Sequence, residues 1–240
     1  MSDAEKDRRI GRDEMNLAEF PIALVAERVP PRCKTLVFES QHGTLTVTGS
    51  DVYGLPTAPD SDVIVGLIQL TKLRNDFTCP TVPFSRYELL KLLGWEDKGR
   101  NYQRLDESLR RWVGVTLYYE GAWWDNSIKC RVDESFHILE RVSLFDQEIR
   151  RTLRAQQRTL PLSSFTWNEV FFASCQANNL KQLDLGVYFG LKSAVSKQLY
   201  RFLDKRFYIR GDWTFDLREL AFEHVGLSRN YAIGEIKRKL

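Results

Sequence analysis

The spacing of apolar residues along the chain predicts four helices. Apolar positions three or four residues apart place one side of a segment against a core, and polar residues occupy the other side. Asp60 and Asp62 suit the beginning of the first helix, and Gly94 separates the second helix from the third. The predicted helices cover residues 60–73, 85–93, 99–112 and 191–207.

Short runs of β-branched and aromatic residues predict strands between these helices. The first two runs lie on either side of a turn that contains Gly43, which indicates a hairpin. The last two runs follow the third helix and are separated by turn-forming residues, which indicates a second hairpin. The strands are expected at residues 36–38, 44–48, 82–84, 115–119 and 136–139.

The elements between residues 60 and 139 follow the order helix, strand, helix, turn, helix, hairpin, which is typical of a winged helix. In that arrangement the helix after the turn, here residues 99–112, enters a groove of DNA. The order begins again near the end of the chain. The sequence FSRYEL (84–89) aligns with FDLREL (215–220), LGW (93–95) with VGL (225–227), and RNY (100–102) with RNY (229–231). We therefore predict an α+β fold of tandem winged-helix units, the second truncated at the C-terminus.

This pattern divides the chain into four parts. Residues 1–14 carry mixed charges and few apolar residues, and are expected to be a disordered tail. Residues 15–150 form the first winged-helix domain with its N-terminal hairpin. Residues 151–185 form a connector, in which the aromatic residues after position 164 form a further strand or pack between units. Residues 186–240 form the second winged-helix domain, which is incomplete.

Basic residues gather in four stretches, although the net charge is only +3. Residues 98–111 hold five basic residues and two acidic ones, and residues 192–210 hold six basic residues and one acidic one. Residues 150–158 carry four arginines and no acid, and residues 229–239 carry four basic residues and one glutamate. Such an uneven distribution indicates one surface that faces phosphates.

The helix over residues 99–112 divides into an apolar stripe and a polar face. Tyr102, Leu105, Leu109 and Trp112 lie three or four residues apart and form the stripe. Arginine side chains on the other face suit contacts with phosphates and with guanine edges. We expect Arg100, Arg104 and Arg111 to make most of the DNA contacts of the first unit. The full candidate set is Lys98, Arg100, Asn101, Arg104, Ser108 and Arg111, with Arg229, Asn230, Lys237, Arg238 and Lys239 in the second unit.

With these residues in place, the chain resembles the plasmid replication initiator protein A family, whose relatives are built from two winged helices. The resemblance runs from residue 16 to the end of the sequence. It implies binding to repeated double-stranded DNA sequences in a plasmid origin, local melting of the duplex, and recruitment of the host initiator and the replicative helicase. The phrases that carry it are NLAEFP (16–21), VTGSDVYGLPTA (47–58), RYELLKLLGW (86–95), SLRRWVGVTL (108–117), AWWD (122–125) and LYRFLDKRFY (199–208).

Other functions fit parts of the same pattern. A transcriptional repressor could use the same fold, and an initiator can also repress its own gene. An interaction module that touches no DNA is consistent with the low net charge, and a homodimer is compatible with each reading. Two local alternatives also stay open: Arg150–Arg158 is a solvated connector or contacts phosphates, and Trp123–Trp124 pack within the hairpin or stack on nucleotides.

The sequence offers no pattern for catalysis, a metal or a cofactor. Its four cysteines and three histidines are widely dispersed, and neither a phosphate-binding GxxxxGK[ST] loop nor a histidine pair for a nicking site is present. The chain also lacks an apolar run long enough to cross a bilayer and an N-terminal signal core. We therefore expect a cytoplasmic protein that is not an enzyme.

Overall fold

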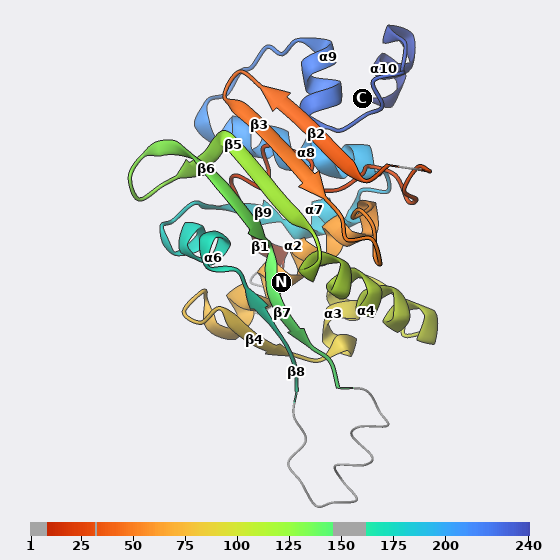
Figure 1. Cartoon of the computed structure of the whole chain (residues 1–240), viewed down its shortest axis with the longest axis vertical. Coiled ribbons are helices and arrows are strands. Elements are labelled where there is room, and N and C mark those ends of the chain that lie inside the picture. The colour runs from red at the N-terminus through yellow and green to blue at the C-terminus, as the bar shows by residue number, and fades with distance from the viewer. Residues whose placement is uncertain (1–8, 32, 146–161) are drawn as a thin grey trace, which may run out of the picture.

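Three antiparallel sheets and the helices packed on them form a mixed α+β fold in the computed structural model, which describes residues 9–31, 33–145 and 162–240 (Figure 1). The two-stranded sheet pairs β1 (Ile10–Glu14) with β9 (Leu180–Asp184). The four-stranded sheet has the order β2 (Thr35–Ser40), β3 (Gly43–Thr48), β5 (Thr116–Asp125), β6 (Cys130–His137). The three-stranded sheet has the order β4 (Thr81–Phe84), β8 (Ser163–Trp167), β7 (Leu139–Ser143).

The four predicted helices are present with small changes at their ends. Thr57 and Asp60 form a capping box at the beginning of α2, and the Ser85 hydroxyl accepts the Glu88 N–H at the beginning of α3. The corresponding helices are α2 (Ala58–Asn75), α3 (Arg86–Leu92), α4 (Gly99–Val113) and α8 (Ala194–Ile209). The remaining helical elements are α6 (Glu169–Gln176), α7 (Leu185–Gly190), α9 (Leu217–Glu219), η1 (Leu220–His224) and α10 (Ile233–Lys239).

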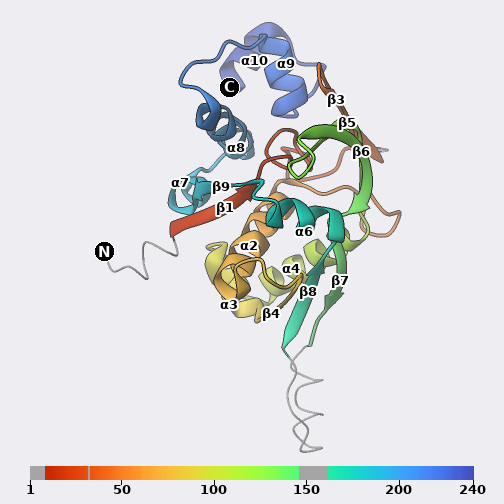
Figure 2. The same cartoon turned by 90° about the vertical axis from the view of Figure 1, so that its left-hand side faces the viewer.

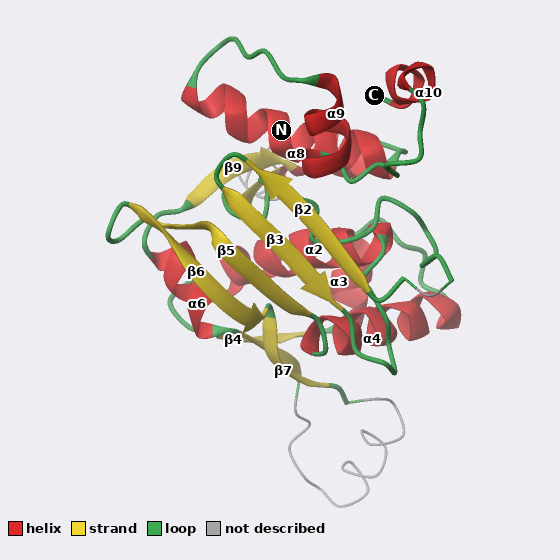
Figure 3. Cartoon of the chain, turned by 45° about the horizontal axis from the view of Figure 1, so that its top comes forward, coloured by secondary structure: helices red, strands yellow, loops and turns green. Residues whose placement is uncertain are grey.

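The hairpin predicted after the third helix is also present, but it belongs to a different sheet from the one expected. Strand β5 pairs with β3, with Leu117 opposite Val47, so β5 and β6 extend the first hairpin (Figure 3). The strands that complete the sheet of β4 are β7 and β8, which come later in the sequence. The alternating apolar residues of β5 face the core between this larger sheet and α2. This alternation does not specify which strand pairs with β5.

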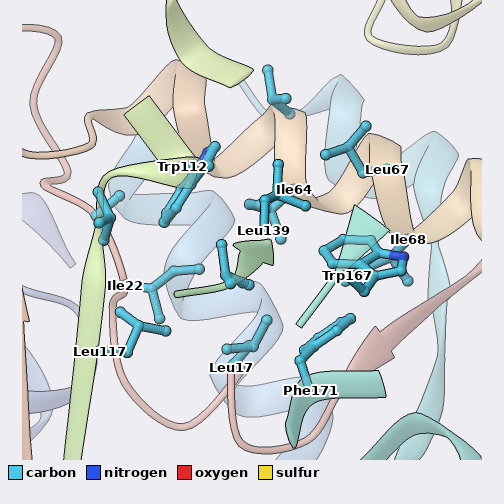
Figure 4. Close-up of a cluster of buried hydrophobic side chains, with 14 of the residues drawn as sticks. Leu17, Ile22, Ile64, Leu67, Ile68, Trp112, Leu117, Leu139, Trp167 and Phe171 are labelled. Atoms are coloured by element: carbon cyan, nitrogen blue, oxygen red, sulfur yellow. The ribbon is translucent and has the colours of Figure 1, made fainter. Parts of the chain in front are cut away.

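A single large core joins elements from residue 17 to residue 175. Trp112 of α4, Trp167 of β8 and Phe171 of α6 are fully or almost fully buried, and they gather around Ile64 and Ile68 of α2 (Figure 4). The Trp167 indole donates to the Thr71 hydroxyl at 2.8 Å, which ties β8 to α2. The described part of residues 151–185 is therefore not a connector, because β8 and α6 belong to the large core and β9 pairs with β1.

The N-terminal segment is ordered where a tail was expected. Residues 1–8 lie outside the described part, but Ile10–Glu14 form β1, which pairs with β9 (Figure 2). Asp13 and Glu14 are fully buried. Asp13 receives two hydrogen bonds from Arg201, and Glu14 accepts hydrogen bonds from backbone and side-chain donors, including Ser174 at 2.8 Å. A charged segment is thus stable inside the protein because its charges have partners.

Helices α8, α9, η1 and α10 form a smaller unit with its own apolar cluster around Val225 and Ile236. Its junction with the rest of the chain combines apolar packing, which includes Val25, with polar contacts. The Glu223 carboxylate accepts the Glu39 N–H of β2 at 2.7 Å, and the His224 ring nitrogen lies 2.9 Å from the Glu19 carbonyl oxygen. Burial lowers the pKa of the His224 imidazole, which favours a neutral ring packed between Phe20 and Phe202.

Candidate nucleic-acid interface

Helix α4 presents an exposed, predominantly basic stripe along the side that faces away from the core. It lies at the outer edge of the molecule, at the lower right of Figure 1. The buried side carries Leu105, Leu109 and Trp112. The exposed residues recur three or four positions apart, as one face of a helix requires. They are Arg100, Gln103, Arg104, Glu107 and Arg110.

Neighbouring aromatic and polar groups orient the cations of this stripe. The Arg104 guanidinium lies over the Trp95 ring at 4.9 Å, and the Arg110 guanidinium lies 3.4 Å from the Tyr53 hydroxyl. The stacking holds Arg104 without neutralising it. Arg100 is exposed and has no acidic partner in the part of the chain that the structure describes. These three arginines can therefore approach phosphates or base edges without first breaking an ion pair.

Two predicted contacts at the beginning of α4 are partly engaged within the turn. Lys98 forms an exposed ion pair with Glu96 at 2.7 Å. The Asn101 side-chain amide donates to the Glu96 carbonyl oxygen at 2.8 Å. Both side chains shape the turn between α3 and α4, and an exposed ion pair of this kind exchanges easily for a phosphate.

Ser108 and Arg111 do not belong to the exposed face on which the helical spacing placed them. Ser108 is 1% exposed, because it lies three residues after Leu105 and shares the buried stripe. The side chain of Arg111 is only 19% exposed. Its guanidinium contacts the Asp60 carboxylate at 2.6 Å and donates to the Tyr53 carbonyl oxygen at 2.8 Å.

Asp60 links α4 to the beginning of α2, a role that the sequence did not reveal. One carboxylate oxygen accepts the Thr57 N–H and hydroxyl, and the other contacts Arg111. The Asp60 carbonyl oxygen accepts the Trp112 indole N–H at 2.9 Å. The spacing of Thr57 and Asp60 signals a helix cap, but only the fold brings Arg111 to it. Arg111 therefore positions α4.

The predicted contacts of the second unit surround α10. Arg229 and Asn230 lie in the turn before this helix, which begins at Ile233, and Arg229 pairs with Glu223 at 2.9 Å. The remaining three lie in its last turn and are exposed, with Lys239 over the Tyr231 ring at 4.8 Å. These three are Lys237, Arg238 and Lys239.

Comparison with known families identifies the family of this chain. A family model described as Replication initiator protein A matches residues 12–233. The chain belongs to this family. No curated protein matches its sequence.

Two solved structures resemble the fold of this replication initiator protein A family member. A crystal structure of selenomethionine derivatives of domains 2 and 3 of RctB superposes with a TM-score of 0.58 at 16% identity, covering 93% of this chain and 80% of that chain. A crystal structure of RctB domains 2–3 superposes with a TM-score of 0.48 at 17% identity, covering 93% and 79% of the two chains. The first similarity shows a shared fold.

In this family member the structure also corrects the surface charge that the sequence predicts for residues 192–210. Four of its six cations have internal acidic partners: Lys197 pairs with Asp62, Arg201 with Asp13, and both Lys205 and Arg206 with Glu19. Those pairs fasten α8 to the first unit. The stretch therefore contributes far less charge to the surface than its sequence suggests.

The remaining predictions have mixed outcomes. Trp123 is 2% exposed and packs edge-on against Tyr119 and Phe136, so the packing alternative holds for this residue. Trp124 is half-buried, and its indole donates to Asn126 at 3.2 Å. Arg150–Arg158 lie outside the described residues.

Two searches of the described residues were negative. None of the helices there is both long enough and apolar enough to cross a bilayer. The same residues contain no group of three or more histidine, cysteine or acidic side chains arranged to hold a metal ion.

Proposed function

We propose that the chain is a plasmid replication initiator that binds repeated double-stranded DNA sequences at the origin through the exposed face of α4. Membership of the replication initiator protein A family supports the role in replication. The observation that carries the DNA contact is the stripe of Arg100, Arg104 and Arg110. All three are exposed, and none is held in an ion pair with a described residue.

The topology around α4 supports a winged-helix reading of this unit. Helix α2 is followed by β4, α3 and α4, and β4 then forms a sheet with β7 and β8. A winged helix has this order, with the later hairpin paired to the strand between the first two helices. The β5–β6 hairpin, which joins β2 and β3 in the larger sheet, is then an insertion between α4 and β7. An ion pair between Arg86 and Asp106, at 2.6 Å, fixes α3 against α4.

The second unit supports a further contact with the duplex. Helix α10 lies on the same side of the molecule as α4, at the right of Figure 1, and its last turn carries Lys237, Arg238 and Lys239. A duplex that follows this side would meet both helices. We propose that Lys237 and Lys239 contribute mainly phosphate contacts, because lysine is a point charge without the paired donors that read guanine.

We further propose that the initiator melts DNA without catalysis and helps to recruit the host initiator and helicase. Contacts with distorted DNA offset the cost of bending and unstacking, which is on the order of a few kcal/mol. Binding energy alone can therefore open a flexible, A·T-rich stretch beside the repeats. A contact of Arg150–Arg158 with phosphates, the alternative to a solvated connector, stays a prediction.

Replacement of Arg104 by alanine tests the assigned face. If Arg104 reads a base, Arg104→Ala should weaken binding to an origin repeat by about 1–3 kcal/mol and binding to a scrambled duplex by less. The measurement is a fluorescence anisotropy titration with both duplexes over a range of salt concentrations. The unfolding midpoint should change little, because the side chain is exposed and stacks on Trp95 without an ion pair to a described residue.

A matched control removes a positive charge from the other side of the protein. Lys129→Ala acts at the turn between β5 and β6, at the left of Figure 1, and should leave both affinities unchanged. Equal binding by Arg104→Ala and the parent chain would show that the assigned face is wrong. Direct repeats beside the gene would support initiation, whereas a single palindrome over a promoter would point to repression.

A further inference from the structure

Lys192 stands apart from the other cations of residues 192–210. Four of these six cations form ion pairs with Asp13, Glu19 and Asp62. Arg210 stacks on the Trp213 ring at 3.9 Å, at the C-terminal end of α8. Lys192 is exposed in the turn before α8 and has no acidic partner within the described ranges. It is therefore the cation of this stretch that remains available at the N-terminal end of α8.

Lys192 borders a groove that separates the two units of the protein. The groove has a volume of about 320 Å³ and a mainly polar lining. Arg104 and Trp95 form the side that belongs to the α3–α4 region, and Lys192 and Ala194 form the side that belongs to the beginning of α8. The groove thus adjoins the middle of the exposed stripe of α4.

One of the two carboxylates that line this groove has a cationic partner. Asp62 lines it but is neutralised by Lys197 at 2.7 Å. Glu27 also lines it and is exposed. The unpaired cations at the two walls are Arg104 and Lys192. An anion that spans the walls would meet one positive charge from each unit.

The beginning of α8 adds donors to the same wall. Its N-cap residue, Ser193, makes no side-chain capping hydrogen bond. The backbone N–H groups of the first turn of a helix have no partner within the helix, and phosphates commonly accept from them. Helix α8 is 16 residues long, so its dipole adds to the attraction for an anion near Lys192.

We propose that the duplex bound by α4 continues across this groove, and that Lys192 and the N-terminus of α8 contact a phosphate of its backbone. The proposal rests on DNA binding by α4. It assigns to the α7–α8 turn a role in affinity that is independent of base sequence, because a phosphate contact carries no sequence information. It also gives one duplex a contact with both units at their junction.

The test compares Lys192→Ala with Arg210→Ala in the full chain. Both variants remove one cation without an acidic partner from the same basic stretch, and the two positions flank opposite ends of α8, about 24 Å apart along its axis. Binding is measured with a duplex that carries an origin repeat and with a scrambled duplex of equal length, between about 50 and 200 mM salt. Circular dichroism melting checks that both variants are folded.

Lys192→Ala should weaken binding to both duplexes by a similar factor, about threefold to tenfold, and reduce the slope of log affinity against log salt by about 1. Arg210→Ala should bind both duplexes as the parent does. If the parent binds and Lys192→Ala matches it, the phosphate contact is wrong while the function of α4 stands. Equal losses from both variants would also overturn the contact, since they would indicate a general charge effect. If the parent chain binds neither duplex, both the proposed function and this inference are wrong.

Discussion

Replacement of Asp13 by alanine should lower the free energy of unfolding by about 3–5 kcal/mol, the loss typical of breaking a buried ion pair from one side. Asp13 is completely buried, and the side chain of its partner Arg201 is 1% exposed. Two hydrogen bonds, at 2.7 and 2.8 Å, join the carboxylate to the guanidinium. Without the carboxylate, Arg201 would keep a buried charge with no ion-pair partner among the described residues. Chemical denaturation followed by tryptophan fluorescence measures the loss.

A double variant separates the buried charge from the lost packing. Asp13→Val combined with Arg201→Met removes both charges, and it should be more stable than Asp13→Ala. If the double variant loses as much stability as the two single variants together, the pair is not coupled as the structure indicates. The affinity of α4 for DNA should survive in any folded variant, because neither residue lies on the exposed stripe.

The same pair predicts how acid acts on the fold. Burial alone would raise the pKa of Asp13, but the Arg201 guanidinium, together with Lys181 and a backbone hydrogen bond, outweighs burial and lowers it. A carboxyl whose folded pKa is depressed contributes stability above its unfolded pKa and loses that contribution as the pH falls through the folded value. The contribution of Asp13 should therefore be complete at neutral pH and disappear only below the ordinary range of aspartate. Parent and Asp13→Ala should approach equal stability in strong acid.

Asp60→Ala should lower the free energy of unfolding by about 2–4 kcal/mol, since it removes a helix cap and the acidic partner of Arg111 together. Asp60 is 2% exposed, and its carboxylate holds Thr57 and Arg111 with different oxygens. Because α4 is anchored to α2 through this carboxylate, the variant should also lose discrimination between an origin repeat and a scrambled duplex. Denaturation and paired duplex titrations below the unfolding midpoint measure both effects.

An exposed ion pair supplies the control for Asp60. Asp51→Ala breaks the pair of Asp51 with Lys34, in which both side chains are largely exposed. It should leave the unfolding midpoint and duplex discrimination unchanged. A fully stable Asp60→Ala variant would contradict the anchoring role of this residue.

The helices and most strands could be predicted from the sequence, because local apolar periodicity determines them. Strand pairing could not. The β5–β6 hairpin alternates as a wing would, and its pairing with β3 depends on contacts between segments far apart in the chain. The place of β7 and β8 beside β4 is equally nonlocal.

The candidate DNA surface was predicted in part for a related reason. Helical spacing correctly predicted that Arg100 and Arg104 are exposed. It did not reveal that Arg111 forms an ion pair with Asp60, which lies far from it in the sequence. Local charge counts likewise misjudged the stretch around Arg201, because its acidic partner lies near the N-terminus. A sequence records how many charges a segment has, whereas the fold decides which of them are neutralised.

Photo-crosslinking from α4 tests the central claim most directly. A photoreactive side chain in place of Gln103, which is exposed in the middle of the stripe, should crosslink to an origin duplex in the bound complex. The same group in place of Tyr118, exposed on the four-stranded sheet, should give no crosslink under identical conditions. If the complex forms but crosslinks arise from position 118 and not from position 103, α4 does not carry the DNA contact.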